Sequence, residues 1–383
     1  MSGSRVRLTA VCIGMLAVGS AGADTLDDAL TAIKSVGPRG VNHPAAQRAW
    51  PVAARSPIAD LPRILAALDD ANPLAANWLR SAAEAVAQGA AARGDKSAAP
   101  LLERFVGETS HRPSARRLAY ELLLSFDPAA EQRLLAGFLD DPSTELRREA
   151  VAAVVAVADS TTDDERKKSE LRRAFHASRD LDQVKEIVAA LKKLSVEVDL
   201  PTHLGFITRW KLVGPFDNAG EKGFDVSYPP ESDIRLDAEY VGKDGKKIAW
   251  IDFTTTDPYG EVDLNKALGK HKGAAAYAFA EFHATAAGTA EFRLGSISAV
   301  KLWLNGRLLD ERKVYHSGSE VDQYISRGEL QAGTNRILLK VCENEQTESW
   351  AQDWKFQLRV CDAVGTPVPS QGRVAAESNI KAE

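Results

Sequence analysis

Cysteine and methionine are both scarce in this chain of 383 residues, which contains three and two of them. Cys12 lies in an N-terminal apolar stretch, which leaves Cys342 and Cys361 for the rest of the chain. If the segments that carry them form a simple hairpin, a disulfide is out of reach, whereas another strand order could bring the two thiols together. Two cysteines without an adjacent histidine cluster do not support a zinc site, and we predict no cofactor and no metal.

The motifs of common enzyme classes are also missing. The sequence has no Gly-x-Ser-x-Gly elbow, no His-Glu-x-x-His and no phosphate-binding glycine-rich loop after a strand. Carboxylate pairs such as Glu343 and Glu345 occur, but a glycosidase pair needs a defined separation across a cleft, which a sequence does not give. We therefore expect a non-catalytic protein, with a carbohydrate-active enzyme as the less favoured alternative.

Long apolar runs are absent after the N-terminus. Arg5 and Arg7, the apolar residues 8–18 and the Ala21-Gly-Ala site before Asp24 form the pattern of a secretory signal peptide over residues 1–23. A retained N-terminal anchor is the alternative. No later segment is apolar enough to cross a bilayer, so we predict no stable membrane insertion and export to the periplasm, the cell surface or the extracellular space.

An excess of positive charge is absent as well. The formal net charge is −5, and loss of Arg5 and Arg7 with the signal peptide removes two positive charges, which gives −7. A mildly acidic chain without a basic stripe is a poor match for the phosphates of nucleic acid. We predict no nucleic-acid partner.

Residues 24–200 are rich in Ala, Leu, Arg and Glu, and proline or aspartate interrupts them at short intervals, which predicts a series of helices. Arg80, Arg116 and Arg147 each begin an Arg-x-x-Ala pattern, at spacings of 36 and 31 residues, the size of a two-helix unit. The best copy, residues 139–151 (LDDPSTELRREAV), resembles HEAT-like repeats. The resemblance implies a stacked α-solenoid with a possible protein partner on its concave face. Two further helices are expected at about 164–178 and 180–194.

Residues 201–365 have a different composition, because nineteen of the 26 aromatic residues lie beyond Pro201. Val300, Leu302 and Leu304 alternate with Lys301 and Trp303, the pattern of a half-buried strand. Asn305-Gly306 then supplies a type I′ turn.

Further strands are expected in the same region, and together they predict an antiparallel β-sandwich. The expected strands are residues 206–213, 240–241, 247–253, 275–284, 290–294, 308–314, 321–325, 337–343 and 354–362. The stretch 217–237 is a long irregular loop, either functional or a strap over the sandwich edge. Residues 366–383 form a polar tail that we expect to be disordered.

A family resemblance is carried by residues 300–308 (VKLWLNGRL) and 330–341 (LQAGTNRILLKV). These resemble the sugar-binding jelly roll of β-galactosidase-type glycosidases, with its "V-W-L-N-G" hairpin and "L-x-x-G-x-N-x-L-x-V" strand. The resemblance covers about residues 275–362 and implies a galactose-binding-like jelly roll. The matching residues are structural, so no binding residue is carried over from the family.

Candidate ligand-binding residues follow from aromatic side chains in polar surroundings. Trp303 shares the outer strand face with Lys301 and could stack on a sugar ring, or the loop 217–238 could cover it. Trp350 and Trp354 lie on a loop rich in amides and carboxylates, among them Asn344 and Asp353, which suits a glycan site. Trp354 could instead begin the last strand and fill the end of the sandwich.

Tyr315 and His316 are a weaker third candidate, on the connection at the opposite side.

The leading hypothesis is an exported, non-catalytic protein that recognises carbohydrate or a glycosylated surface through the β-sandwich. The alternative is a protein–protein interaction scaffold that binds its partner through the helical repeats.

Overall fold

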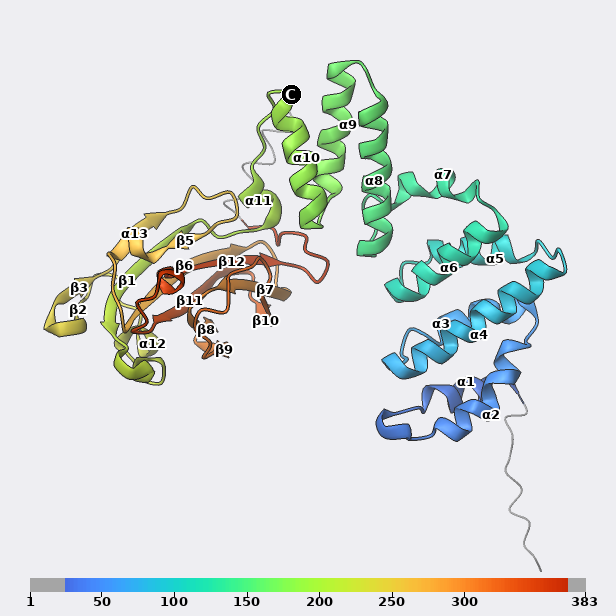
Figure 1. Cartoon of the computed structure of the whole chain (residues 1–383), viewed down its shortest axis with the longest axis horizontal. Coiled ribbons are helices and arrows are strands. Elements are labelled where there is room, and N and C mark those ends of the chain that lie inside the picture. Colours follow the sequence, from blue (N-terminus) through green and yellow to red (C-terminus); the bar gives the residue numbers. More distant parts are fainter. Residues whose placement is uncertain (1–24, 371–383) are drawn as a thin grey trace, which may run out of the picture. The chain divides into compact units, whose positions relative to one another are not determined.

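The structure is a computed structural model that describes residues 25–370. Helices occupy the N-terminal part of the chain and antiparallel sheets the C-terminal part, as predicted (Figure 1). The chain forms two compact units, which divide between Leu146 and Arg147. The predicted signal peptide, residues 1–23, and residues 371–383 of the predicted tail lie outside the described part of the chain.

The first unit is helical. Its helices are α1 (Leu26–Lys34), α2 (His43–Ala54), α3 (Leu61–Ala66), α4 (Pro73–Ala92), α5 (Ala98–Gly107), α6 (Pro113–Phe126), α7 (Ala130–Leu134) and the start of α8 (Thr144–Ser160). The repeated arginine at Arg116 is buried, donates to both carboxylate oxygens of Asp141 at 2.7 Å and also donates to the Val106 carbonyl. A bidentate pair with an extra carbonyl satisfies a buried guanidinium, so this copy of the repeat connects successive helices.

The second unit begins with the rest of α8 and continues with α9 (Asp164–Ala177), α10 (Leu181–Lys193) and the short α11 (Leu200–Leu204). The two helices predicted at 164–178 and 180–194 are confirmed. The Asp163 side chain accepts from the Arg166 amide at 2.7 Å and so caps α9, which explains why the acidic run starts a helix.

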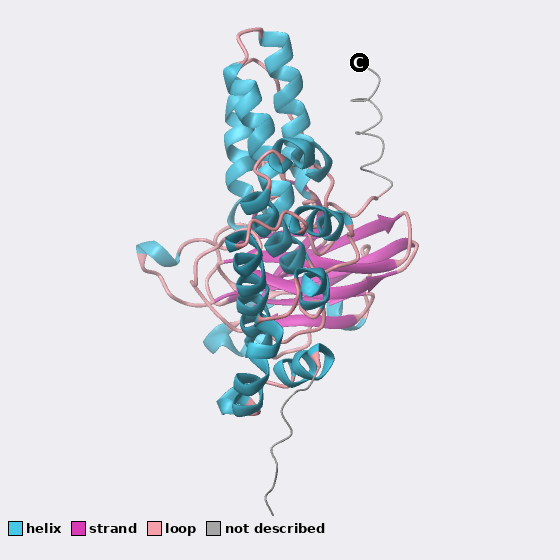
Figure 2. Cartoon of the chain, turned by 90° about the vertical axis from the view of Figure 1, so that its right-hand side faces the viewer, coloured by secondary structure: helices cyan, strands magenta, loops and turns pink. Residues whose placement is uncertain are grey.

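Two antiparallel sheets follow (Figure 2, strands in magenta). The six-stranded sheet has the order β4 (Ile251–Thr254), β1 (Arg209–Asp217), β6 (Ala274–Ala284), β11 (Gly333–Glu343), β8 (Ala299–Leu304) and β9 (Arg307–Arg312). The four-stranded sheet has the order β10 (Tyr324–Leu330), β7 (Gly288–Ser296), β12 (Lys355–Cys361) and β5 (Val262–Asp263). A separate hairpin pairs β2 (Glu239–Val241) with β3 (Lys247–Ala249), as expected from its turn.

The inward side chains of both sheets form one apolar cluster. Val300, Leu302 and Leu304 belong to it, while Lys301 and Trp303 face outward, as the alternation predicted. Asn305 and Gly306 have φ values of 51° and 82°, which confirms the left-handed turn between β8 and β9. The period-2 pattern therefore assigned the faces of this hairpin correctly.

Several strands differ from their predicted bounds. The single strand expected at 247–253 is divided into β3 and β4, which belong to different sheets. β1 runs to Asp217 rather than ending near Val213, because a register shift between Val213 and Phe216 accommodates Gly214-Pro215 inside the strand. The strand expected at 321–325 is instead β10, which begins at Tyr324. Asp322 has a φ of 63°, a conformation that ends strand geometry before this point.

The two remaining cysteines lie in different sheets, because β11 and β12 are not neighbours. The hairpin considered for them therefore does not form. Both thiols are buried and free. Residues 366–370, at the start of the predicted tail, form isolated bridges to Cys361 and Ala284. Among the described residues, no helix combines the length and apolarity needed to cross a membrane.

Candidate functional site

Residues 218–238, here called the strap, lie across the outer face of the six-stranded sheet. The strap contains a 3-10 turn (Ala219–Phe224) and the short α12 (Pro229–Ser232). Phe224 is buried and Tyr228 and Ile234 are half-buried, and all three pack on outward sheet residues that include Tyr277 and Leu338. The strap therefore covers much of a sheet face that would otherwise expose apolar side chains.

A buried lysine anchors the strap to the sheet. The Lys340 ammonium, on β11, is fully buried and donates to the Phe224 carbonyl at 3.1 Å and the Val226 carbonyl at 2.6 Å. It also lies 2.9 Å from the Glu231 carboxylate, which in turn accepts from the Tyr277 hydroxyl. Burial, together with that bond, raises the pKa of Tyr277 above its ordinary value. Three acceptors satisfy the three ammonium donors, so Lys340 has a structural role here.

A groove of about 450 Å³ remains beside the strap. The half-buried indole of Trp303 and the side chain of Leu338 come from neighbouring strands, where the two residues are cross-strand partners. Residues 230–234 of the strap line one part of the groove, and Asn305, Gly306, Gln331, Thr334, Arg336 and Glu281 line the rest. An indole among amides, carboxylates and a guanidinium is the composition that suits a polar ligand with one apolar surface.

Several polar groups in this groove are left without strong partners. Within residues 25–370, neither the Asp233 nor the Glu281 carboxylate accepts a hydrogen bond or forms an ion pair, and both residues are exposed. Arg336 is the cross-strand partner of Glu281, and its guanidinium makes a long contact of 3.5 Å to the Ile234 carbonyl and lies over the Phe279 ring. The groove thus presents donors and acceptors to solvent next to an aromatic surface.

Four of the predicted ligand residues meet at the opposite end of β11. His316 Nε2 lies 2.8 Å from the Asn344 side-chain oxygen, and the Trp350 ring meets the His316 ring edge-on at 5.3 Å. Trp350 is 58% exposed. The Tyr315 hydroxyl accepts from the side chain of the buried Asn218 at 3.2 Å, and burial raises the pKa of Tyr315. Asn344 and Trp350 were expected on one loop, but Tyr315 and His316 were expected on the opposite side. That expectation is wrong, because the connection after β9 brings His316 against Asn344 and Trp350.

The chemistry of this loop cluster is set by the Asn344 side chain. Its oxygen also accepts from the Gln346 amide, so the neighbouring His316 nitrogen must be the one that carries the proton. The other ring nitrogen, His316 Nδ1, is buried without a hydrogen-bond partner among the described residues. The acidic residues Glu221, Glu345 and Glu348 line a shallow cavity of about 510 Å³ beside Asn344.

The other two predicted residues lie elsewhere. Trp354 is 1% exposed, belongs to the apolar core and donates to the Val341 carbonyl at 3.3 Å, so it offers no surface to a ligand and fills the interior instead. Asp353 forms an ion pair with Lys355 at 3.2 Å.

Sequence reasoning missed Asp233, Glu281 and Arg336. The single carboxylate of Glu281 within the apolar strand β6 was the signal that could have found the groove.

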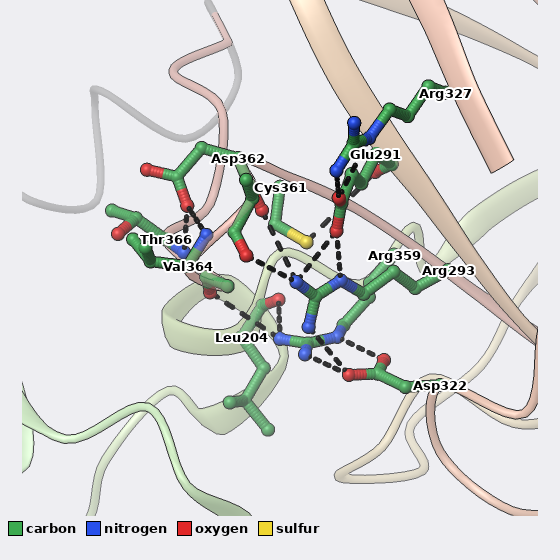
Figure 3. Close-up of polar contacts among 12 residues, drawn as sticks. Leu204, Glu291, Arg293, Asp322, Arg327, Arg359, Cys361, Asp362, Val364 and Thr366 are labelled. Atoms are coloured by element: carbon green, nitrogen blue, oxygen red, sulfur yellow. Dashed lines mark hydrogen bonds and ion pairs between the residues drawn. The ribbon is translucent and has the colours of Figure 1, made fainter. Parts of the chain in front are cut away.

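The outer face of the four-stranded sheet carries a different arrangement. Asp322 lies between the guanidinium groups of Arg359 and Arg293, and Glu291 lies between those of Arg293 and Arg327 (Figure 3). Arg359 is buried and also donates to the Leu204 carbonyl at the end of α11, at 3.2 Å. Burial alone would raise the pKa of Asp322, but the two arginines lower it below its ordinary value. Because these charged groups pair with one another, their role is structural.

Comparisons with known proteins match solved structures at low similarity and show no family. No protein-family pattern matches the chain, and no curated protein sequence matches it. Among solved structures, the chain is similar to Kluyveromyces marxianus β-glucosidase in complex with glucose, at 12% identity and a TM-score of 0.27, over 45% of this chain and 18% of that one. It is also similar to a β-glucuronidase from an uncultured Clostridium, at 11% identity and a TM-score of 0.26, over 41% of this chain and 29% of that one.

A third similar structure is much smaller. A family 35 carbohydrate-binding module from Clostridium thermocellum matches at 14% identity and a TM-score of 0.16, over 27% of this chain and 99% of the module. The chain therefore spans less than a third of the length of the two glycosidases.

Proposed function

We propose that this protein is an exported, non-catalytic carbohydrate-binding protein. In this proposal the two sheets form a galactose-binding-like β-sandwich that recognises carbohydrate or a glycosylated surface, and the N-terminal helices form a HEAT-like repeat platform. The ligand lies in the groove beside the strap, with one sugar ring stacked on Trp303.

One observation carries this proposal: the half-buried Trp303 indole shares a groove with Asp233, Glu281 and Arg336, whose charged groups have no ion-pair partner within residues 25–370. Pyranose rings combine an apolar CH face with a rim of hydroxyl groups. An indole packs against the CH face, and the carboxylates and the guanidinium exchange hydrogen bonds with the hydroxyl groups. The indole is supported from below by the sheet, so little side-chain freedom is lost on binding.

The test is a glycan array with the purified chain, followed by calorimetry with soluble glucan, xylan, mannan and galactan. Trp303→Ala should weaken binding by roughly tenfold to thirtyfold, because an aromatic anchor of this kind contributes about 1.4–2 kcal/mol. Ile325→Ala is the matched control, since Ile325 is an exposed apolar residue on the other sheet. If no glycan binds, or if Trp303→Ala binds like the wild type, the proposal is wrong.

Trp350 marks a second position at which the same function could reside. Its exposed indole, the edge-on His316 ring and the Asn344 amide give that end an aromatic surface with polar neighbours. Trp350→Ala distinguishes the two positions. We expect it to leave binding unchanged while Trp303→Ala weakens it, and the reverse result would move the site to the Trp350 end.

A second candidate function is a protein-interaction scaffold, and a groove of about 330 Å³ between α3 and α5 favours it. Ala66, Leu101 and Phe105 give this groove an apolar surface, and Arg63 and Arg104 also line it. A partner held there should be lost from the Leu101→Glu variant and retained by Trp303→Ala. Glycan binding should show the opposite dependence.

A further inference from the structure

A second cavity, of about 680 Å³, lies at the end of the six-stranded sheet next to α11. Thr208 and Arg209 at the start of β1 line it, as do Phe282 and His283 near the end of β6. Arg209 is exposed, and its side chain has no hydrogen bond or ion pair within residues 25–370. None of these residues has a role in the function proposed above.

The second cavity and the groove at Trp303 are adjoining. Glu281 lines both of them. A second link is a side-chain hydrogen bond of 2.9 Å between Thr334, which lines the groove, and His283, which lines the second cavity. Thr334 and His283 are cross-strand partners, as are Arg336 and Glu281, so the two cavities meet along the boundary between β11 and β6.

The side chains along this boundary continue the chemistry of the groove. Arg336, Glu281 and Arg209 lie on β11, β6 and β1, which are successive neighbours in the sheet. Across the sheet they place a hydrogen-bond donor, an acceptor and a second donor side by side. The Thr208 hydroxyl and the His283 ring can each donate or accept a hydrogen bond. A row of donors and acceptors suits successive hydroxyl-bearing rings of one chain better than a single ring.

We propose that the groove and the second cavity form one binding path, and that the ligand is an oligosaccharide chain that extends from Trp303 past Glu281 to Arg209. Ligand pockets typically measure about 300–1,000 Å³, and either cavity alone reaches that size. Together they exceed what a single sugar unit fills. This inference rests on the proposed carbohydrate function and names its substrate class as an extended chain.

The test compares chain lengths. Disaccharides and hexasaccharides of β-1,4-linked glucan, xylan, mannan and galactan are titrated into the full chain by calorimetry. For the sugar that binds, the hexasaccharide should bind at least tenfold more tightly than the disaccharide. Arg209→Ala should remove most of that advantage without changing the affinity for the disaccharide. Thr208→Trp, which fills the second cavity instead of deleting a contact, should have the same effect.

Arg327→Ala is the matched control, because it removes the same charge from the outer face of the other sheet and should preserve the preference for the longer chain. Equal affinity for both lengths, with Trp303→Ala weakening both, would overturn the extended path and leave the carbohydrate function intact. An unchanged hexasaccharide affinity in both Arg209→Ala and Thr208→Trp would overturn it as well. Absence of binding by every sugar would overturn both proposals.

Discussion

The two outer sheet faces use the same anchoring device and differ in what surrounds it. On the four-stranded sheet, the buried Arg359 binds the Leu204 carbonyl and the Asp322 carboxylate. On the six-stranded sheet, the buried Lys340 binds strap carbonyls and the Glu231 carboxylate. In both, a cation from a central strand holds a covering segment by its backbone oxygens.

The difference lies beyond the anchor. On the four-stranded sheet the neighbouring Arg293 pairs with both Glu291 and Asp322, so these charges are all satisfied within the sheet face. On the six-stranded sheet the strap leaves the Trp303 indole lining a groove, beside charged groups without ion-pair partners in the described chain. A buried charge therefore indicates how a face is held together, and the unpaired groups outside it indicate where a ligand could bind.

The largest effect is expected from breaking the paired face. Asp322→Asn leaves Arg359 and Arg293 without their shared carboxylate, and loss of one partner of a buried ion pair costs about 3–5 kcal/mol. The free energy of unfolding, measured by urea denaturation of the full chain, should fall by that amount. Asp252→Asn is the control, because it breaks the exposed Lys211–Asp252 pair and should cost less than about 1 kcal/mol. If both variants lose a similar amount of unfolding free energy, the Asp322 pairs stabilise the fold no more than an exposed ion pair does.

Lys340→Met should lower the free energy of unfolding by a smaller amount and should also weaken glycan binding. Methionine keeps the apolar volume but removes the bonds to Phe224, Val226 and Glu231, at a cost of about 2–3 kcal/mol. Because the strap forms one side of the groove, glycan affinity should fall with stability. Limited chymotrypsin digestion should then cut at Phe224 or Tyr228.

Lys211→Met is the control for this variant, because Lys211 lies on β1 of the same sheet and its ammonium pairs with an exposed carboxylate, Asp252, at 2.6 Å. It should retain both the strap and the binding. If the Lys340 variant stays resistant to protease and binds normally, the lysine does not position the groove.

Local sequence signals predicted the parts of this molecule that depend on near neighbours. Asn305-Gly306 fixed the hairpin, because two left-handed residues between alternating strands leave few other conformations. The Asp163 cap likewise marked the start of α9. The outward direction of Trp303 followed from the period of two alone.

The groove could not be predicted in the same way, because distant segments build it. Glu231 and Lys340 are 109 residues apart, and no local pattern says that the strap lies on the sheet face beside Trp303. Trp350 and Trp354 illustrate the same limit. They are four residues apart in one polar loop, yet one is 58% exposed and the other 1%, because only Trp354 lies next to the core strands.

The smallest effect expected concerns pH and the face held by ion pairs. His203 on α11 stacks on Phe175 at 4.0 Å and lies 3.0 Å from the Ser178 carbonyl. Burial, together with the positive charges of Arg179, His176 and Arg359, lowers the pKa of His203 to about 3. An unfolded histidine has a pKa of about 6.5, so its contribution to stability is complete above that pH and is lost as the pH falls toward 3.

At pH 5 this loss amounts to about 2 kcal/mol relative to pH 7, because the unfolded chain binds a proton that the folded imidazole does not. In His203→Gln the side chain can still donate to the Ser178 carbonyl but cannot titrate. Between pH 7 and pH 5 the free energy of unfolding of this variant should therefore fall by about 2 kcal/mol less than that of the wild type. Between pH 7.5 and 8.5 the difference between the two proteins should stay constant, since the imidazole is then neutral in both states. Parallel curves from pH 7 to pH 5 would show that His203 is not held neutral against α9, and that this face depends on its ion pairs alone.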